Sequence, residues 1–269
     1  MLPSTLETLR QARKDCRLSQ LELSLRLGVS QRHISFVESG RSKPSRELLV
    51  AWLQALNAPL VLCNDIMLQA GYAPVYKTTQ LDDPTLTQIN DALQQLLSAH
   101  DPQPALVIDS QWNLLRLNRG GQWLAAVLMP GMSDSTSDEP INLLDMLVHP
   151  EGMAKLVTNL HEVGPAFLTR LRHEASAQPA LTPKADAFAA LLNTRLGTQY
   201  VQKKSQKIWS PPIAPVLTTN YATQYGELSF FSMFTTFGTP QDITLESLRV
   251  EHLFAADTAT YAVLKEQIQ

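Results

Sequence analysis

The chain has 269 residues, of which 44% are hydrophobic and 17% are charged, and its formal net charge is −3. This length is typical of about two domains, and the hydrophobic content excludes a chain that is mostly disordered. No apolar run approaches the ~20 residues that cross a bilayer, and the first residues lack the pattern of a signal peptide, so we expect a cytoplasmic protein with no membrane partner. The two cysteines, Cys16 and Cys63, lack a metal or redox spacing and are expected to be buried, reduced thiols.

Charge is distributed unevenly along the chain. Residues 1–74 carry nine Lys and Arg against six Asp and Glu, whereas residues 75–269 carry thirteen against nineteen. Residues 10–46 alone hold nine basic and three acidic side chains. A basic N-terminal region followed by an acidic C-terminal region is typical of a polyanion-binding module that is attached to a domain without nucleic-acid contacts.

The first helices follow from local signals. Apolar spacing predicts a helix over residues 5–16, and Ser19 with Glu22 forms a capping-box pattern at the start of a second helix. Gly28 supplies the positive φ of a sharp helix exit, and Ser30 is placed to cap a third helix. The residues expected to point inward from these two helices are Leu23, Leu27, Ile34 and Val37.

Two short helices joined through a glycine turn have helix-turn-helix geometry, although an ordinary corner of two helices in an enzyme is the alternative. The third helix would then be the recognition helix. Its candidates for reading bases are Gln31, Arg32, His33 and Phe36. Phe36 is a candidate for contact with a thymine methyl group or with a second copy of the chain. The candidates for contact with the DNA backbone are Gln20, Ser30, Arg41, Lys43 and Arg46.

The first domain is expected to be all-α, with five helices in residues 1–74. Ser45 caps the fourth helix, and residues 60–70 form the fifth. Residues 75–103 are predicted to be a linker and a connecting helix that runs from Asp83-Pro84 to about His100, with one apolar face formed by Leu86, Ile89, Leu93 and Leu96. This helix either packs onto the second domain or pairs with its copy across a dimer.

Residues 104–269 have the order of an α+β domain with an antiparallel sheet. The predicted strands are residues 105–108, 112–117, 216–222, 228–237 and 248–254. The predicted helices begin after Asn118, Thr182 and Asp257, with a helical middle kinked at Gly164-Pro165. Residues 130–140 are rich in Ser, Asp and Gly and are expected to form a mobile loop.

No constellation of catalytic or metal-binding residues is evident. None of the six histidines has a metal-binding spacing, and the chain lacks a nucleophile elbow, a dinucleotide-binding glycine motif and a Walker loop. We therefore expect no enzyme activity and no cofactor. The second domain instead has aromatic candidates for an apolar ligand pocket, and for each of them a plain core position is the alternative: Trp112, Phe167, Tyr221, Phe230 and Phe234.

The stretch SQLELSLRLGVSQRHISFVESGRSKPS resembles the Cro/C1 (xenobiotic-response-element) class of helix-turn-helix. GYAPVY, PALVIDSQWNLLRLN, HPEGM and FFSMFTTFGTPQDITLESLRVEHLFAADTAT resemble the MmyB-like bacterial regulators, which add a PAS-like ligand-binding domain. The resemblance implies a ligand-binding role for residues 104–269. It also implies that Arg13 of the first helix pairs with Glu38 of the recognition helix.

The resulting expectation is a one-component transcription regulator whose binding to double-stranded DNA is modulated by a small apolar ligand. One helix-turn-helix buries too little surface for tight specific binding, so we expect a homodimer on a palindromic operator. The alternative is an antitoxin-like autoregulator, in which the C-terminal domain binds a protein partner.

Overall fold

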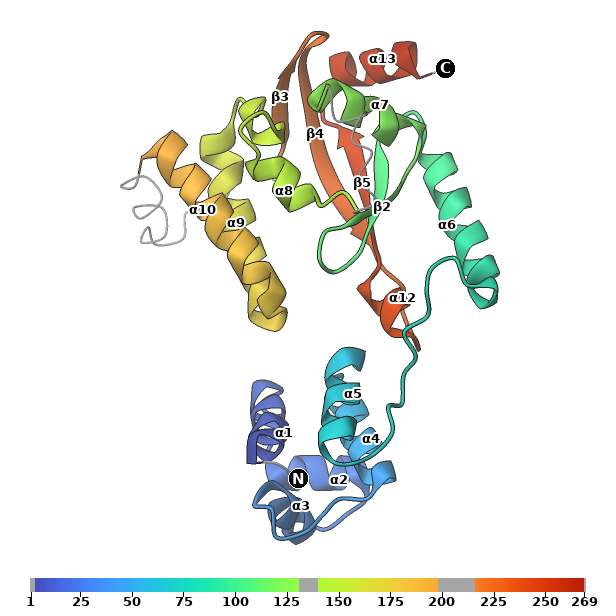
Figure 1. Cartoon of the computed structure of the whole chain (residues 1–269), viewed down its shortest axis with the longest axis vertical. Helices are drawn as coiled ribbons and strands as arrows, with labels where there is room; N and C mark the ends of the chain where they lie inside the picture. Colours follow the sequence, from blue (N-terminus) through green and yellow to red (C-terminus); the bar gives the residue numbers. More distant parts are fainter. Residues whose placement is uncertain (1–2, 131–139, 198–215, 269) are drawn as a thin grey trace. The chain divides into compact units, whose positions relative to one another are not determined.

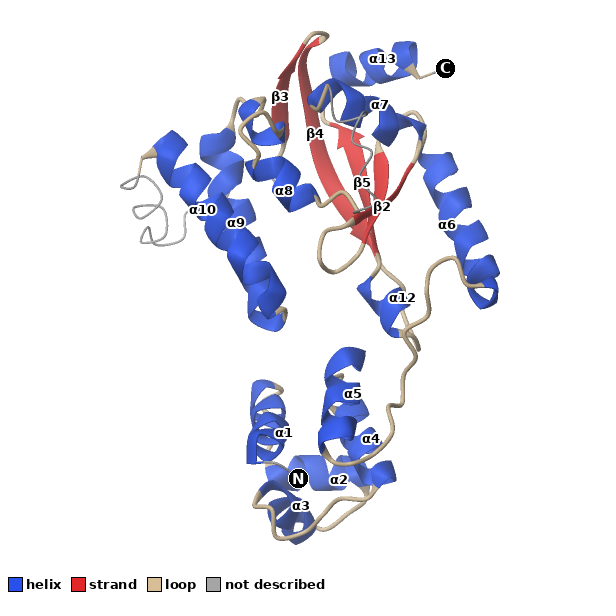
Figure 2. Cartoon of the chain, in the orientation of Figure 1, coloured by secondary structure: helices blue, strands red, loops and turns tan. Residues whose placement is uncertain are grey.

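The computed structural model describes residues 3–130, 140–197 and 216–268, which form two compact units (Figure 1). The first unit comprises Met1–Asp83 and Phe237–Glu246, and the second comprises Pro84–Thr236 and Ser247–Gln269. The described strands all belong to the second unit (Figure 2). Five helices followed by an α+β domain with an antiparallel sheet confirm the predicted fold class.

The head, residues 3–69, consists of five helices: α1 (Pro3–Asp15), α2 (Gln20–Leu27), α3 (Gln31–Glu38), α4 (Arg46–Ala55) and α5 (Leu60–Gln69). Serine side chains cap three of them. The Oγ atoms of Ser19, Ser30 and Ser45 accept backbone N–H groups from the first turns of α2, α3 and α4. Each cap satisfies an N–H group that has no partner within its helix, so these helices start where the sequence predicts.

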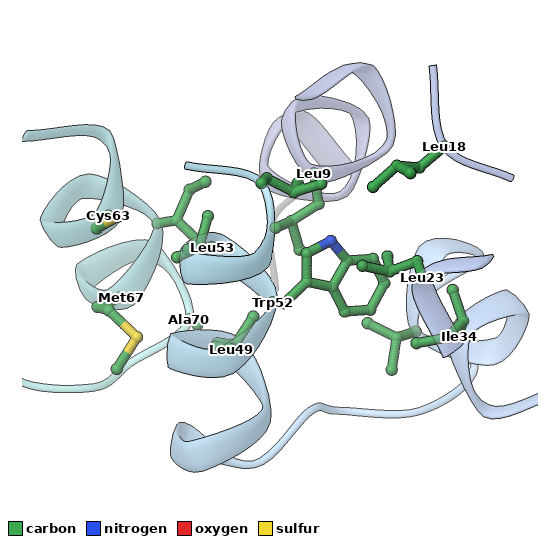
Figure 3. Close-up of a cluster of buried hydrophobic side chains, with 13 residues drawn as sticks. Leu9, Leu18, Leu23, Ile34, Leu49, Trp52, Leu53, Cys63, Met67 and Ala70 are labelled. Atoms are coloured by element: carbon green, nitrogen blue, oxygen red, sulfur yellow. The ribbon is translucent and has the colours of Figure 1, made fainter. Parts of the chain in front are cut away.

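One cluster of buried apolar side chains joins the helices of the head (Figure 3). Trp52 of α4 is fully buried, and it belongs to the same cluster as Leu9 of α1 and Leu23 of α2. Ile34 of α3 and Met67 of α5 also belong to this cluster. Because protein cores are packed as densely as organic crystals, the position of α3 is linked to the position of α5 through these side chains.

The second unit carries five strands and most of the remaining helices. Its strands are β1 (Ala105–Ile108), β2 (Leu114–Leu117), β3 (Thr219–Thr223), β4 (Gly226–Thr235) and β5 (Arg249–Ala255). Its α-helices are α6 (Thr87–His100), α7 (Arg119–Leu128), α8 (Leu143–Val148), α9 (Leu160–Ala177), α10 (Thr182–Leu196) and α13 (Thr258–Gln267). Short 3₁₀ turns are η1 (Pro84–Leu86), η3 (Met153–Lys155) and η4 (Pro179–Leu181). Helix α12 (Ile243–Ser247) lies between β4 and β5 in sequence.

The sheet is antiparallel throughout, in the order β2-β1-β5-β4-β3. Tyr221 of β3 lies opposite Leu228 of β4. Because directly paired residues point to the same face and alternate residues of one strand share a face, Tyr221, Phe230 and Phe234 point to one face of the sheet. Phe231 points to the opposite face and stacks on Phe254 of β5, with ring centroids 5.4 Å apart.

Helices cover both faces of this sheet. Helices α8, α9 and α10 contribute Leu144, Leu168 and Phe188 to a core that also includes residues of β1. Helices α7 and α13 contribute Leu124 and Leu264 to a second cluster, which contains Leu228 and Phe230 of β4. On the opposite face, the His100 ring of α6 makes an edge contact with Phe254 at 4.8 Å.

Several strand boundaries differ from the prediction by one to three residues, and only β1 has both of its predicted ends. β2 begins at Leu114 rather than at Trp112, because Trp112 has φ +67°, which an extended strand does not allow. β3 begins at Thr219, and β4 ends at Thr235. The predicted loop over residues 130–140 lies almost wholly outside the described residues.

Two further expectations are wrong in detail. A 3₁₀ turn precedes α6, and the buried stripe then runs through Leu86, Leu93 and Leu97, whereas Leu96 is exposed. With about 3.6 residues per turn, Leu97 lies closer than Leu96 to the direction shared by Leu86 and Leu93, so Leu97 continues the buried stripe. Cys63 is buried as predicted, but Cys16 is exposed near the end of α1.

Candidate functional site

The turn between α2 and α3 has the geometry that the sequence predicts. Gly28 has φ +66°, a left-handed conformation that glycine adopts without steric cost, and its N–H ends α2 on the carbonyl of Leu25. Ser30 then caps α3 through the N–H of His33 at 3.2 Å. The side chain of Leu23 is fully buried, so the turn is anchored from within the core.

The N-terminal end of α3 presents polar side chains to solvent. Gln31 and Arg32 are exposed, and His33 and Phe36 are half-buried beside them. The Arg32 guanidinium lies 5.1 Å from the centroid of the Phe36 ring, and the Arg41 guanidinium lies 5.9 Å from the same centroid. Both distances are within the range of cation–π attraction. The Phe36 ring therefore contacts one cation of the helix and one cation of the following loop.

Further exposed cations follow α3: Lys43 in the loop and Arg46 at the start of α4. Lys43 Nζ lies 5.1 Å from the ring centroid of Tyr72, and the Tyr72 hydroxyl donates to the carbonyl of Pro44 at 2.8 Å. The sequence prediction missed Tyr72. Its position directly after Gly71, beyond the end of α5, gave no indication that it would lie against the loop.

A buried ion pair joins α1 to α3. Arg13 Nε and Nη2 donate to the two carboxylate oxygens of Glu38 at 2.7 and 3.0 Å, and Arg13 Nη1 donates to the carbonyl of Leu18 at 2.6 Å. Gln20 also donates to Glu38, at 2.7 Å, so its side chain is held inside the head rather than extended toward solvent. Burial opposes ionisation of Glu38, but the hydrogen bonds from Arg13 and Gln20 outweigh it and lower the pKa of Glu38.

The five aromatic candidates of the second unit divide into two groups. Trp112, Phe167 and Phe234 belong with the cluster of α8, α9 and α10, and Phe167 meets Trp112 edge-on at 5.5 Å. Tyr221 and Phe230 belong with the cluster of α7 and α13, and their ring centroids are 6.5 Å apart. Burial raises the pKa of Tyr221, which keeps its hydroxyl neutral.

A polar cluster that the sequence prediction missed lies among these aromatic side chains. Glu174 accepts hydrogen bonds from Trp112 Nε1 at 2.9 Å and Arg170 Nε at 2.9 Å, and it pairs with Arg249 Nη1 at 3.0 Å. Burial opposes ionisation of Glu174, but Arg249 and Arg170 outweigh it and lower its pKa. The Arg170 guanidinium also lies 4.2 Å from the Phe234 centroid. The spacing of Arg170 and Glu174 on one helix was a local signal, but Arg249 lies on a distant strand.

The part of the chain that the structure describes contains neither a metal site nor a membrane-spanning helix. Within residues 3–130, 140–197 and 216–268, no three His, Cys, Asp or Glu side chains come together to hold a metal ion. No helix in those same ranges is both long enough and apolar enough to cross a bilayer.

Comparison with known families finds two matches. The family described as MmyB-like transcription regulator ligand binding domain matches residues 89–266. The family described as helix-turn-helix matches residues 9–62, which include α2, α3 and the turn between them. No curated protein matches the chain.

Proposed function

The chain belongs to the family of MmyB-like transcription regulators, and on this premise we propose that α3 reads the bases of a two-fold-symmetric operator while a small apolar ligand in the second unit adjusts the affinity. The observation that carries the proposal is the exposed N-terminal end of α3, where Gln31 and Arg32 follow the Ser30 cap. In helix-turn-helix proteins this end of the recognition helix enters the major groove.

Arg32 is the residue proposed to read guanine, because a guanidinium forms two hydrogen bonds with the O6 and N7 atoms of that base. Phe36 supports this role because its ring holds the Arg32 guanidinium. We propose this role for Phe36 instead of the contact with a thymine methyl group that the sequence also suggested. Arg41, Lys43 and Arg46 are proposed to contact phosphates, which position a protein on DNA without reading sequence.

The experiment begins with selection of an operator from random duplexes with the full-length protein. Affinities for this operator and for a scrambled duplex are then measured by fluorescence anisotropy. Arg32→Ala should reduce the ratio of the two affinities by about 5- to 150-fold, the usual value of a bidentate base contact. Arg26→Ala, which removes an exposed cation of α2, is the control and should leave that ratio unchanged. An unchanged ratio in Arg32→Ala would remove Arg32 from the base-reading residues.

Dimerisation is part of the proposal, because two heads on half-sites about one helical turn apart provide the surface that one head lacks. The connecting helix α6 and the rest of the second unit are the proposed interface, since the basic head must remain free for DNA. Mass measurement in solution, with and without the selected operator, tests this step. A monomer that binds one half-site as tightly as the complete operator would contradict it.

The proposed ligand site lies on the sheet face that carries Phe234. On this face Leu228 and Phe230 are buried, whereas Ser232 is exposed and Phe234 is only half-buried, so the covering helices leave part of the face accessible. Binding of the neutral apolar dye N-phenyl-1-naphthylamine tests this site. Phe234→Lys should abolish dye binding, and Met233→Lys, on the opposite face, is the matched control that should retain it. Equal binding by both variants would contradict the site.

A further inference from the structure

Residues 237–246, the crossover segment, belong by their contacts to the first unit although they connect two strands of the second. They leave the end of β4, contact residues that follow or begin α5, and return to β5. β4 and β5 are neighbours in the sheet, so a short hairpin would have been enough to connect them. The longer connection allows the crossover segment to form two sets of hydrogen bonds with the first unit.

The first set is at the start of α5. Pro59 occupies the N-cap position, where its side chain has no hydrogen-bond acceptor, and no side chain of the neighbouring residues caps the helix. Instead, the carboxylate of Glu246 accepts the Leu60 N–H, with N···O distances of 2.9 and 3.1 Å. Glu246 thus supplies, from 186 residues further along the chain, an acceptor for the first of the N–H groups that have no partner within α5. A carboxylate is also favoured there by the helix dipole.

The second set holds the chain that leaves the head. Asp242 is buried and accepts a hydrogen bond from the Thr79 hydroxyl at 2.5 Å, and the backbone N–H of Ile243 donates to the carbonyl of Lys77 at 2.9 Å. Asp242 also accepts the N–H of Thr244 at 2.8 Å, which fixes the start of the short helix α12. The crossover segment therefore holds both α5 and the chain that follows the head.

Helix α5 is not peripheral to DNA recognition. Its side chains Cys63, Ile66 and Met67 belong to the core cluster that contains Ile34 and Val37 of α3. Gln69 near its end also accepts a hydrogen bond from Thr5 of α1. A change at the start of α5 can therefore alter the recognition helix through packed side chains rather than through a flexible linker.

We propose that Glu246 is the positioning residue through which the second unit acts on the DNA-binding head. When β4 and β5 change, the crossover segment moves with them because it is continuous with both strands, and the cap of α5 is strengthened or released. The inference rests on the proposed function, since it gives the route by which the ligand site alters DNA affinity. It requires no knowledge of the ligand, because coupling between two sites is reciprocal. DNA bound to the head must therefore alter β4 and β5.

The test measures hydrogen exchange by mass spectrometry on the full-length protein, with and without the selected operator. In the wild type, operator should slow exchange in peptides from β4 and β5, by about 5- to 150-fold if the coupling has the usual strength. In Glu246→Ala, the Leu60 amide should exchange about 2- to 30-fold faster, the typical effect of losing an N-cap, and the response of β4 and β5 to DNA should disappear. Glu266→Ala, which removes an exposed carboxylate of α13, is the control and should respond as the wild type does.

A second variant distinguishes the loss of the contact between Glu246 and α5 from a loss of stability of α5 itself. In Pro59→Ser/Glu246→Ala, the new serine supplies a local cap, so α5 should keep its protection and the head should bind the operator with wild-type affinity. The response of β4 and β5 should still be absent, because the hydrogen bond from α5 to the crossover segment has been lost. A merely structural role for Glu246 would restore that response together with α5.

The possible results distinguish this inference from the proposed function. If no duplex is selected by the wild type, the proposed function fails and the inference falls with it. If the operator binds and Arg32→Ala loses discrimination, but β4 and β5 do not respond to DNA in the wild type, only the inference is overturned. A full wild-type response in either variant that lacks Glu246 overturns it as well.

Discussion

The Arg13–Glu38 pair gives a sharp test of how the head is held together. The perturbation is Arg13→Ala, which removes the partner that binds both carboxylate oxygens of Glu38. The Glu38 side chain is 1% exposed and the Arg13 side chain 10% exposed, so water cannot replace the lost hydrogen bonds without opening the structure. The variant therefore leaves a buried carboxylate with too few partners.

The magnitude follows from what remains around Glu38. Breaking a buried ion pair by removing one partner costs about 3–5 kcal/mol. Gln20 still donates to Glu38, and Arg10 lies 3.9 Å away with an exposed side chain, so we expect the lower end, about 3 kcal/mol. At about 1.4 kcal/mol for each factor of ten, this loss should speed exchange of core amides in α3 by roughly 150-fold.

The assay is native-state hydrogen exchange at Val37, a buried residue of α3, in the full-length protein. Arg10→Ala is the control, since its exposed cation should contribute less than about 1 kcal/mol. Replacing both Arg13 and Glu38 by methionine should cost less than Arg13→Ala alone, because no unpaired charge is then buried. An effect of Arg13→Ala no larger than that of Arg10→Ala would refute the account of a buried pair.

Three further predictions concern the same head. Lys43→Ala and Arg41→Ala should each reduce the slope of log affinity against log salt concentration by about one unit, and a wild-type slope would remove that residue from the phosphate contacts. Phe36→Leu keeps an apolar side chain but removes the ring that two guanidiniums contact, and anisotropy should record a loss of operator affinity of roughly 2- to 5-fold per cation. In acid, the lowered pKa of Glu38 means that its contribution to stability is present above pH 4.5, the ordinary value, and is lost as the pH falls through the folded-state pKa. As the pH falls from 4.5 through the folded-state pKa of Glu38, the free energy of unfolding from denaturation curves should therefore decrease more steeply for the wild type than for Glu38→Gln. Parallel plots of this free energy against pH would contradict the pKa shift.

Much of the fold was predictable because its signals are local. Ser19, Ser30, Asn118 and Asp257 each cap a helix through an N–H group of the following turn, so the residues that form each contact are neighbours in sequence. The same reasoning explains Gly28, whose role depends only on its own φ. Strand ends were less predictable, because a strand ends where its partner ends, and the partner lies elsewhere in the chain.

The contacts that connect distant segments could not be read from sequence. Glu246 caps α5 because residues 237–246 contact the head. The sequence near Pro59 shows that α5 has no local side-chain cap, but nothing there indicates that a distant glutamate provides one. Arg249 reaches Glu174 because β5 lies at the centre of the sheet, a position that strand order does not reveal until the pairing is known. In both cases the sequence shows the charge of each residue but does not indicate which distant residue it contacts.

The structure also explains how the basic region can be both stable and available to DNA. Arg13, which holds the head together, is buried against a carboxylate. Arg32, Arg41 and Lys43 instead lie on the rings of Phe36 and Tyr72, and within the described residues none of the three forms an ion pair. An aromatic ring orients a cation without cancelling its charge, whereas a carboxylate would have to be displaced by phosphate at a cost in affinity. Arg32, Arg41 and Lys43 therefore keep an uncompensated positive charge on the surface proposed to contact DNA.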